Sequence, residues 1–167
     1  MSGLDELQNE LAEALVEELL SPLGTGQSAL WNLTGAVGSG KSTTLRLVET
    51  KLRESKSLIP IHLQAPGEVD SAPIAILSAA TQLKAHQMLN GELERICDPR
   101  LTLAEKLTAL GPTLEKHRND VVLICDEPLY WQRKEWGDSQ NLGRWLVKEV
   151  PCRRLISGRL PTSDNPD

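Results

Sequence analysis

The chain has 167 residues, of which 40% are hydrophobic and 25% charged, enough for one domain with a substantial core. Its net charge of -5 gives no general attraction to DNA or lipid, and no apolar run approaches the roughly 20 residues of a membrane-spanning helix. The acidic N-terminus lacks the basic and apolar segments of a secretory signal, so we expect a cytoplasmic protein with no membrane partner. Cys97, Cys125 and Cys152 are not spaced for zinc, and we expect them to be reduced core residues.

The first predicted element is an amphipathic helix that begins at a capping-box-like Ser2-x-x-Asp5 and ends near Ser21. Its leucines recur at helical spacing, with acidic residues between them: Leu4, Leu7, Leu11, Leu15 and Leu19. The acidic side is expected to face solvent. Residues 1–24 are therefore assigned to an N-terminal helix and linker.

Strands and helices then alternate along the chain. Residues 29–33 are predicted to form a buried strand, 41–51 a helix, and 58–63 a second strand whose Pro60 indicates an edge or irregular position. Further helices are expected over 73–88 and after the capping box Thr102-x-x-Glu105, the latter kinked or split at Gly111-Pro112. Residues 121–125 suit a strand buried on both faces of a parallel sheet, followed by a helix from about 138 to 150 and a strand over 154–157.

This alternation predicts an α/β fold with a mostly parallel sheet. The core is assigned to residues 25–160, and 161–167 to a disordered tail.

A glycine-rich loop between the first strand and the following helix fits the pattern G-x-x-x-x-G-K-[ST]. Its glycines let successive backbone N–H groups face one anion, and the helix N-terminus adds positive charge. Lys41 can reach the β- and γ-phosphates of a nucleotide, and Ser42 can give its hydroxyl oxygen to Mg²⁺. The residues expected to hold the nucleotide are Gly35, Ala36, Val37, Gly38, Ser39, Gly40, Lys41, Ser42 and Thr43.

A second acidic site follows the apolar strand 121–125. Asp126 would lie at the carboxyl end of this strand, where open α/β sheets bind ligands, and would hold Mg²⁺ together with Ser42. Glu127 would then orient and deprotonate an attacking water.

The two motifs together resemble the P-loop NTPases, specifically the class with a catalytic glutamate after the Walker B aspartate. The resemblance covers about Ala29 to Leu160 and implies a three-layer α/β/α fold that binds ATP and Mg²⁺. No LSGGQ-like signature of ABC ATPases occurs between Thr102 and Asp120, and the N-K-x-D motif of GTPases is absent. RecA-like proteins usually lack the Asp-Glu pair, which leaves the AAA+ proteins and the related STAND signal-transduction ATPases.

The segment "RRLISGRLP", Arg153 to Pro161, is similar to the strand that ends in a sensor residue in AAA+ proteins, or in a short Ser/Thr-Arg element in STAND ATPases. The resemblance implies that Ser157 or Arg159 acts in catalysis beside Lys41 and Glu127. Which of the two has this role stays open, as does the alternative of an ordinary strand end with a solvated arginine.

The resemblance implies a Mg²⁺-dependent ATPase that is weak alone and acts as a switch or motor in a larger assembly, with bacterial signalling or defence suggested by fold-level analogy only. AAA+ modules continue with a lid, so we expect either a truncated chain or a subunit whose site is completed by a protein partner or homo-oligomer. Three alternatives stay open. They are a DNA-associated loader or transposition helper (a partner that the charge does not support), a regulatory module that binds ATP without hydrolysis, and a small-molecule kinase.

Overall fold

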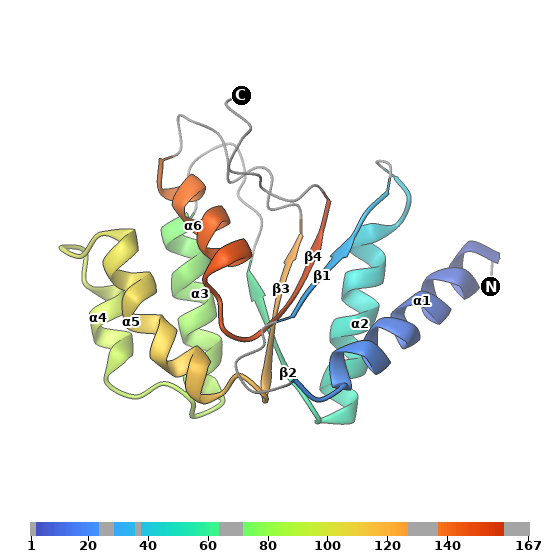
Figure 1. Cartoon of the computed structure of the whole chain (residues 1–167), viewed down its shortest axis with the longest axis horizontal. Coiled ribbons are helices and arrows are strands. Elements are labelled where there is room, and N and C mark those ends of the chain that lie inside the picture. Colours follow the sequence, from blue (N-terminus) through green and yellow to red (C-terminus); the bar gives the residue numbers. More distant parts are fainter. Residues whose placement is uncertain (1–2, 24–28, 36–37, 64–71, 127–136, 159–167) are drawn as a thin grey trace.

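The computed structural model describes residues 3–23, 29–35, 38–63, 72–126 and 137–158, which form an α/β fold (Figure 1). The helices are α1 (Gly3–Leu20), α2 (Lys41–Ser55), α3 (Ala72–Ala85), α4 (Glu92–Cys97), α5 (Leu103–Lys116) and α6 (Gly137–Lys148). The strands are β1 (Leu30–Leu33), β2 (Ile59–Leu63), β3 (Val121–Asp126) and β4 (Arg153–Ser157).

All strand pairs of the described sheet are parallel, and the strand order is β1-β4-β3-β2. The predicted parallel sheet is therefore confirmed. The register pairs Leu33 of β1 and Asp126 of β3 with the same residue of β4, Ser157. The carboxyl ends of these strands consequently meet at one edge of the sheet, which is where parallel α/β sheets usually bind ligands.

Helices cover both faces of the sheet, an arrangement compatible with the expected three layers. In Figure 1, α1 and α2 lie on one side, and α3, α4, α5 and α6 lie on the other. Each face has its own hydrophobic cluster: Leu45, Val48 and Leu52 of α2 pack on one face, whereas α3, α5 and α6 contribute to the other. Alternate β3 residues point to opposite clusters, as the two-residue period of a strand requires.

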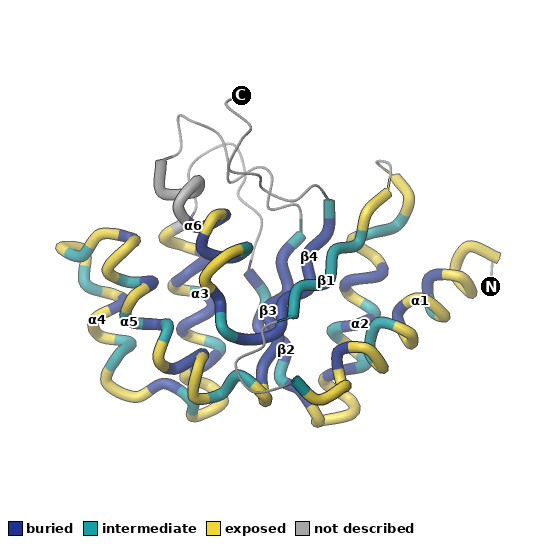
Figure 2. Tube along the Cα trace, in the orientation of Figure 1, coloured by how far each residue is buried: buried dark blue, intermediate teal, exposed yellow. Residues whose placement is uncertain are grey.

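The strands differ in how deeply they are buried, according to their place in the sheet and the helices that cover them (Figure 2). Val121 to Cys125 are buried because β3 has a strand on each side and helices on both faces. The expected buried strand at 29–33 is corrected: all four β1 residues are only half-buried, because β1 is an edge strand that the helices cover less closely than they cover the other edge strand, β2. The edge position that Pro60 indicated for β2 is confirmed.

Four helices differ from the sequence-based expectation, and one of them, α3, ends at Ala85, three residues before the predicted end at 88. α5 begins at the predicted capping box of Thr102 and Glu105 but runs unbroken through Pro112. Buried Leu107, Leu110 and Leu114 on either side of Pro112 hold this helix against the core, and that packing outweighs the lost backbone hydrogen bond. α2 continues four residues beyond the predicted end at 51, and the short helix α4 was not predicted.

The N-terminal helix α1 packs on α2 with a different face from the one its leucines suggest. Its buried residues are Gln8, Ala12 and Leu19, and Leu15 is half-buried. The leucines of its first half are exposed: Leu4, Leu7 and Leu11. Within the part of the chain that the structure describes, no helix combines the length and the apolar character needed to cross a membrane.

The three cysteines have different environments. Cys125 and Cys152 are buried, as expected for core residues, but Cys97 is exposed at the end of α4. Burial raises the pKa of Cys152 to about 12 and that of Cys125 well above its ordinary value, with the neighbouring Asp126 charge adding to the latter shift. Both buried thiols are therefore protonated at neutral pH.

Candidate functional site

The loop after β1 turns the chain into α2 through glycines in the left-handed region. Gly38 has φ +82° and Gly40, the N-cap residue of α2, has φ +90°. These are conformations that glycine adopts without steric penalty. Because glycine has no side chain, Gly40 cannot cap α2, and the first backbone N–H groups of this helix donate to no side chain at the N-cap position. The open N-terminus of α2 is suited to an anion.

Lys41 folds back over this loop. Its Nζ donates a hydrogen bond to the backbone oxygen of Gly35 at 2.7 Å. Ser39 lies on the inside of the same turn: a Cβ added at Gly35 would come within 2.7 Å of the Ser39 hydroxyl oxygen. The ammonium group is thus held at the loop by a backbone carbonyl, a contact that an anionic oxygen could replace.

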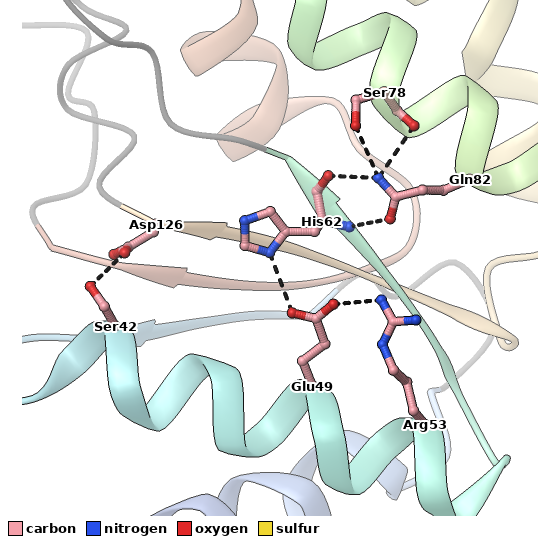
Figure 3. Close-up of polar contacts among 7 residues, drawn as sticks. All are labelled: Ser42, Glu49, Arg53, His62, Ser78, Gln82 and Asp126. Carbon is pink, nitrogen blue, oxygen red and sulfur yellow. Dashed lines mark hydrogen bonds and ion pairs between the residues drawn. The ribbon is translucent and has the colours of Figure 1, made fainter.

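Asp126 is the residue on which separate segments converge. The Ser42 hydroxyl at the start of α2 donates to Asp126 Oδ2 at 2.6 Å (Figure 3). The buried Ser157, at the end of β4, donates its hydroxyl to Asp126 Oδ1. The carboxylate therefore accepts a hydrogen bond on each oxygen, one from the helix after the glycine-rich loop and one from the neighbouring strand.

Register and strand order explain this convergence. Asp126 and Ser157 are paired residues of adjacent parallel strands, and both side chains point to the face that α2 covers. β1 lies next to β4, and the N–H of Gly158 donates to the Leu33 oxygen at 2.9 Å. This pairing brings the end of β1, and hence the loop that follows it, beside the end of β4.

Helix α1 reaches the same loop through Gln8, which the sequence analysis did not identify. A Cβ added at Gly40 would lie 1.7 Å from Gln8 Nε2 and 2.9 Å from its Cδ, so this side chain packs directly on the glycine. Thr44 is a second missed residue: buried, it bonds the Gly40 oxygen through its backbone N–H at 2.9 Å and its hydroxyl at 3.0 Å. The sequence signal for Gln8 was its position four residues before Ala12, on the same face of the helix. The leucines at helical spacing indicated a different face, so this signal was missed.

Away from the loop, β2 is fixed between two helices (Figure 3). Glu49 of α2 accepts from Arg53 at 2.6 Å and lies 3.5 Å from Nδ1 of His62. On the other side, the Gln82 amide of α3 bonds both the backbone N–H and the backbone oxygen of His62, each at 2.9 Å. These contacts hold the edge strand in place but involve none of the predicted site residues.

The structure brings together Lys41, Ser42, Asp126 and Ser157 with the glycines of the loop. Thr43 is exposed on the first turn of α2. Four predicted site residues lie outside the described residues: Ala36, Val37, Glu127 and Arg159. In comparisons with known proteins, the chain matches no protein-family model and none of the curated proteins.

Proposed function

We propose that this chain binds Mg·ATP and hydrolyses the γ-phosphate, as an ATPase of the AAA+ or STAND type. The observation that carries the proposal is the meeting of Ser42 and Ser157 on the two oxygens of Asp126, next to a glycine-rich turn that opens a helix. Arrangements in which a helix N-terminus, a lysine and an acidic strand end share one sheet edge suit a polyphosphate with its cation.

The phosphates would lie over the turn from Gly35 to Ser42. The N–H groups at the start of α2 would donate to phosphate oxygens, and the positive end of the helix dipole favours their charge. Lys41 would exchange its contact with the Gly35 oxygen for the β- and γ-phosphates, because an anionic oxygen is a stronger acceptor than a neutral carbonyl.

The donor set also fits Mg²⁺. No three His, Cys, Asp or Glu side chains gather into a metal cluster among the described residues. Mg²⁺ in nucleotide sites, however, needs only one or two protein oxygens besides phosphate and water. The Ser42 hydroxyl and the Asp126 carboxylate, 2.6 Å apart, are such oxygens. Bound Mg²⁺ would neutralise the charge that develops on the phosphates.

Hydrolysis is assigned to Glu127, which directly follows Asp126 in the chain. Its carboxylate would orient a water in line with the γ-phosphate and accept its proton. Ser157 acts differently: its hydroxyl holds Asp126 in orientation, and its place at the end of β4 puts it beside the loop. Arg159 would stabilise the spread charge of the transition state.

Substitutions at these positions test the proposal by separating binding from turnover. Lys41→Ala should weaken binding of a fluorescent ATP analogue by roughly tenfold to a hundredfold, the value of one or two charge-assisted hydrogen bonds. Glu127→Gln should leave binding intact and reduce phosphate release by roughly 10²- to 10⁴-fold, the contribution of a general base. Asp120→Asn is the matched control, since this exposed aspartate lies at the opposite end of β3 and should change neither.

The alternative, a regulatory module that holds ATP without turning it over, gives a different result. It predicts ATP binding that Lys41→Ala weakens, but no phosphate release for Glu127→Gln to remove. Absence of Mg²⁺-dependent ATP binding in the wild type would reject both forms of the proposal.

A further inference from the structure

The first half of α1 exposes large apolar side chains on one face. Leu4, Leu7 and Leu11 are 56%, 64% and 43% exposed, although the same helix is packed on α2 along another face. On a helix with 100° between residues, these three leucines lie within about 60° of one another. They form one continuous stripe, whereas surface leucines without a binding role are usually scattered singly.

The spacing of this stripe is that of a coiled-coil seam. Leu4, Leu7, Leu11 and the exposed Ala14 are separated by three, four and three residues, the alternation of a and d positions in a heptad. The next seam position is Glu18, which ends the stripe after two heptads. We name these four residues the α1 seam.

The two borders of the α1 seam differ in character. Gln8 and Leu15 border it on the side toward the molecule's own core, where Gln8 is buried and Leu15 half-buried. Glu10 and Glu17 border it on the outer side, and both are exposed. The whole helix carries six carboxylates and no lysine, arginine or histidine, so its field is uniformly negative.

This charge distribution selects the partner. A second copy of α1 would bring two helices with six carboxylates each and no basic residue together, and an antiparallel arrangement would also place Glu10 and Glu17 against the same glutamates. Like-charge repulsion disfavours both arrangements. An anionic membrane surface would repel the helix for the same reason. A helix with leucine-like residues at its own a and d positions and lysine or arginine beside them would complement both the apolar stripe and its acidic border.

We propose that the α1 seam is the docking site for a basic amphipathic helix of a partner protein. The surface is preformed, because Ala12 and Leu19 anchor α1 in the core and Glu13 lies 3.6 Å from Lys51 of α2. Docking therefore does not require α1 to fold or move, which keeps the entropic penalty of association low. The proposal does not depend on nucleotide binding.

The probe for this site is a labelled synthetic peptide of three heptads, with leucine at a and d and lysine at e and g. Fluorescence anisotropy should show binding to the full chain. Leu7→Ala should weaken that binding about tenfold, as truncation of a central apolar anchor typically does. Leu20→Ala is the matched control: Leu20 is 39% exposed on the same helix but lies off the seam, so its truncation should leave binding unchanged.

Charge is tested with the same assay. A peptide with glutamate at e and g should bind at least tenfold more weakly, and Glu10→Lys combined with Glu17→Lys should reverse the preference between the two peptides. A lysine peptide with serine in place of leucine controls for purely electrostatic attraction and should also bind weakly. Circular dichroism melting checks that each variant is folded.

Several results would overturn the proposal. The wild type could fail to bind the peptide with leucine at a and d and lysine at e and g. Alternatively, the wild type and the folded Leu7→Ala variant could bind this peptide equally well. Sedimentation showing a dimer that Leu7→Ala dissolves would identify a second copy as the occupant instead. Co-sedimentation with anionic vesicles that depends on Leu7 would identify a membrane.

Discussion

Asp126 is bonded by hydroxyl groups from opposite directions in the sequence, since Ser42 lies 84 residues before it and Ser157 lies 31 residues after it. Both donors are serine side chains, so they hold the carboxylate in place while they occupy little space at the end of the sheet. Hydrogen bonds to an ionised acceptor are stronger than those between neutral groups, so each hydroxyl helps to fix the direction of the carboxylate. The site thus consists of three residues that lie far apart in the chain. The sequence motifs predicted that Ser42 and Asp126 act together, but not that Ser157 bonds the same carboxylate.

Gly40 is the residue whose replacement should be most informative. Gly40→Ala places a β-carbon at φ +90° and against the Gln8 amide, whereas Gly38→Ala, at φ +82°, meets nothing within 4 Å. The left-handed backbone should cost each variant roughly 1–2 kcal/mol. Gly40→Ala should be the less stable of the two in urea unfolding, because Gln8 must also be displaced.

A double variant isolates the contact with Gln8. Combining Gln8→Ala with Gly40→Ala should restore the stability that Gly40→Ala loses beyond Gly38→Ala. It should not restore the stability that is lost because alanine occupies a left-handed backbone conformation. If the two glycine variants unfold at the same urea concentration, Gln8 does not press on the loop as the structure describes.

The cysteines should differ sharply in reactivity toward iodoacetamide at pH 8. Exposed Cys97 should be alkylated in the folded protein, whereas Cys125 and Cys152 should react only after unfolding, because burial raises the pKa of both thiols. Peptide mapping by mass spectrometry with and without urea measures this. Labelling of Cys152 at the same rate as Cys97 in the folded protein would contradict the described burial.

The raised pKa of the Cys152 thiol predicts a loss of stability at high pH. Cys152 titrates near 12 when folded and near its ordinary value of 9.0 when unfolded. Between these values the folded state binds more protons than the unfolded state, so the free energy of unfolding falls as pH rises. Cys152→Ala should reduce this fall, as measured by urea unfolding between pH 8 and 11.

At the scale of elements, the edge strand β2 is completed by a side chain in place of another strand. The outward-facing N–H and C=O groups of His62 are both bonded by the Gln82 amide, and Gln82 Nε2 also contacts Ser78. One glutamine thus occupies the backbone groups that a foreign strand would use. A neighbouring strand is therefore blocked at this position, and Pro60, two residues earlier in β2, offers no backbone N–H to this edge either.

Gln82→Leu should destabilise the protein by about 1–2 kcal/mol, because two hydrogen bonds to the backbone are lost. It should also raise the propensity to aggregate, because the exposed edge of β2 can then pair. Urea unfolding and light scattering during prolonged incubation measure the two effects. Thr81→Ala on the exposed side of the same helix serves as control and should change neither. Unchanged stability in Gln82→Leu would count against the edge role.

Two buried arginines of β4 connect the sheet to helix ends on both of its faces. Arg153 donates to the Ser21 oxygen after α1 at 2.8 Å and to the Asn119 oxygen after α5 at 3.3 Å. Arg154 donates to the Leu146 and Val147 oxygens near the end of α6, at 2.8 and 2.7 Å. A cation at the carboxyl end of a helix is favourable, and these two side chains donate to carbonyls in or just after the last turn of a helix, where the helix itself provides no partner.

Arg153→Met should lower the free energy of unfolding by roughly 2–3 kcal/mol, because it leaves carbonyls of two separate segments without their charged donor. Hydrogen exchange should report the loss most strongly at the end of α1 and the turn after α5. Arg46→Met, on the exposed side of α2, is a matched control with little expected effect. A variant as stable as the wild type would show that water satisfies these carbonyls equally well.

The periodic elements of this protein could be predicted from local pattern. The apolar run 121–125 predicted the buried central strand, and the pattern over 41–51 predicted most of α2, because apolar residues follow the repeat of each element. The capping box at Thr102 and Glu105 and the edge position of Pro60 were also correct, since both depend on neighbouring residues or on a missing N–H. The candidate site residues followed from the chemistry of the glycine-rich and acidic motifs and, for Ser157 and Arg159, from the resemblance to known families of ATPases.

Other features depend on contacts between distant segments and could not be predicted from local pattern. The sequence of α1 offers two apolar faces, one through the exposed leucines and one through Ala12, Leu15 and Leu19, and only packing on α2 selects the second. The half-buried state of β1 follows from its edge position together with its sparse coverage by helices, and that coverage depends on how distant segments pack. The contacts of Ser42 and Ser157 with Asp126 depend on strand order and register, because those alone bring residues so distant in the chain to one point.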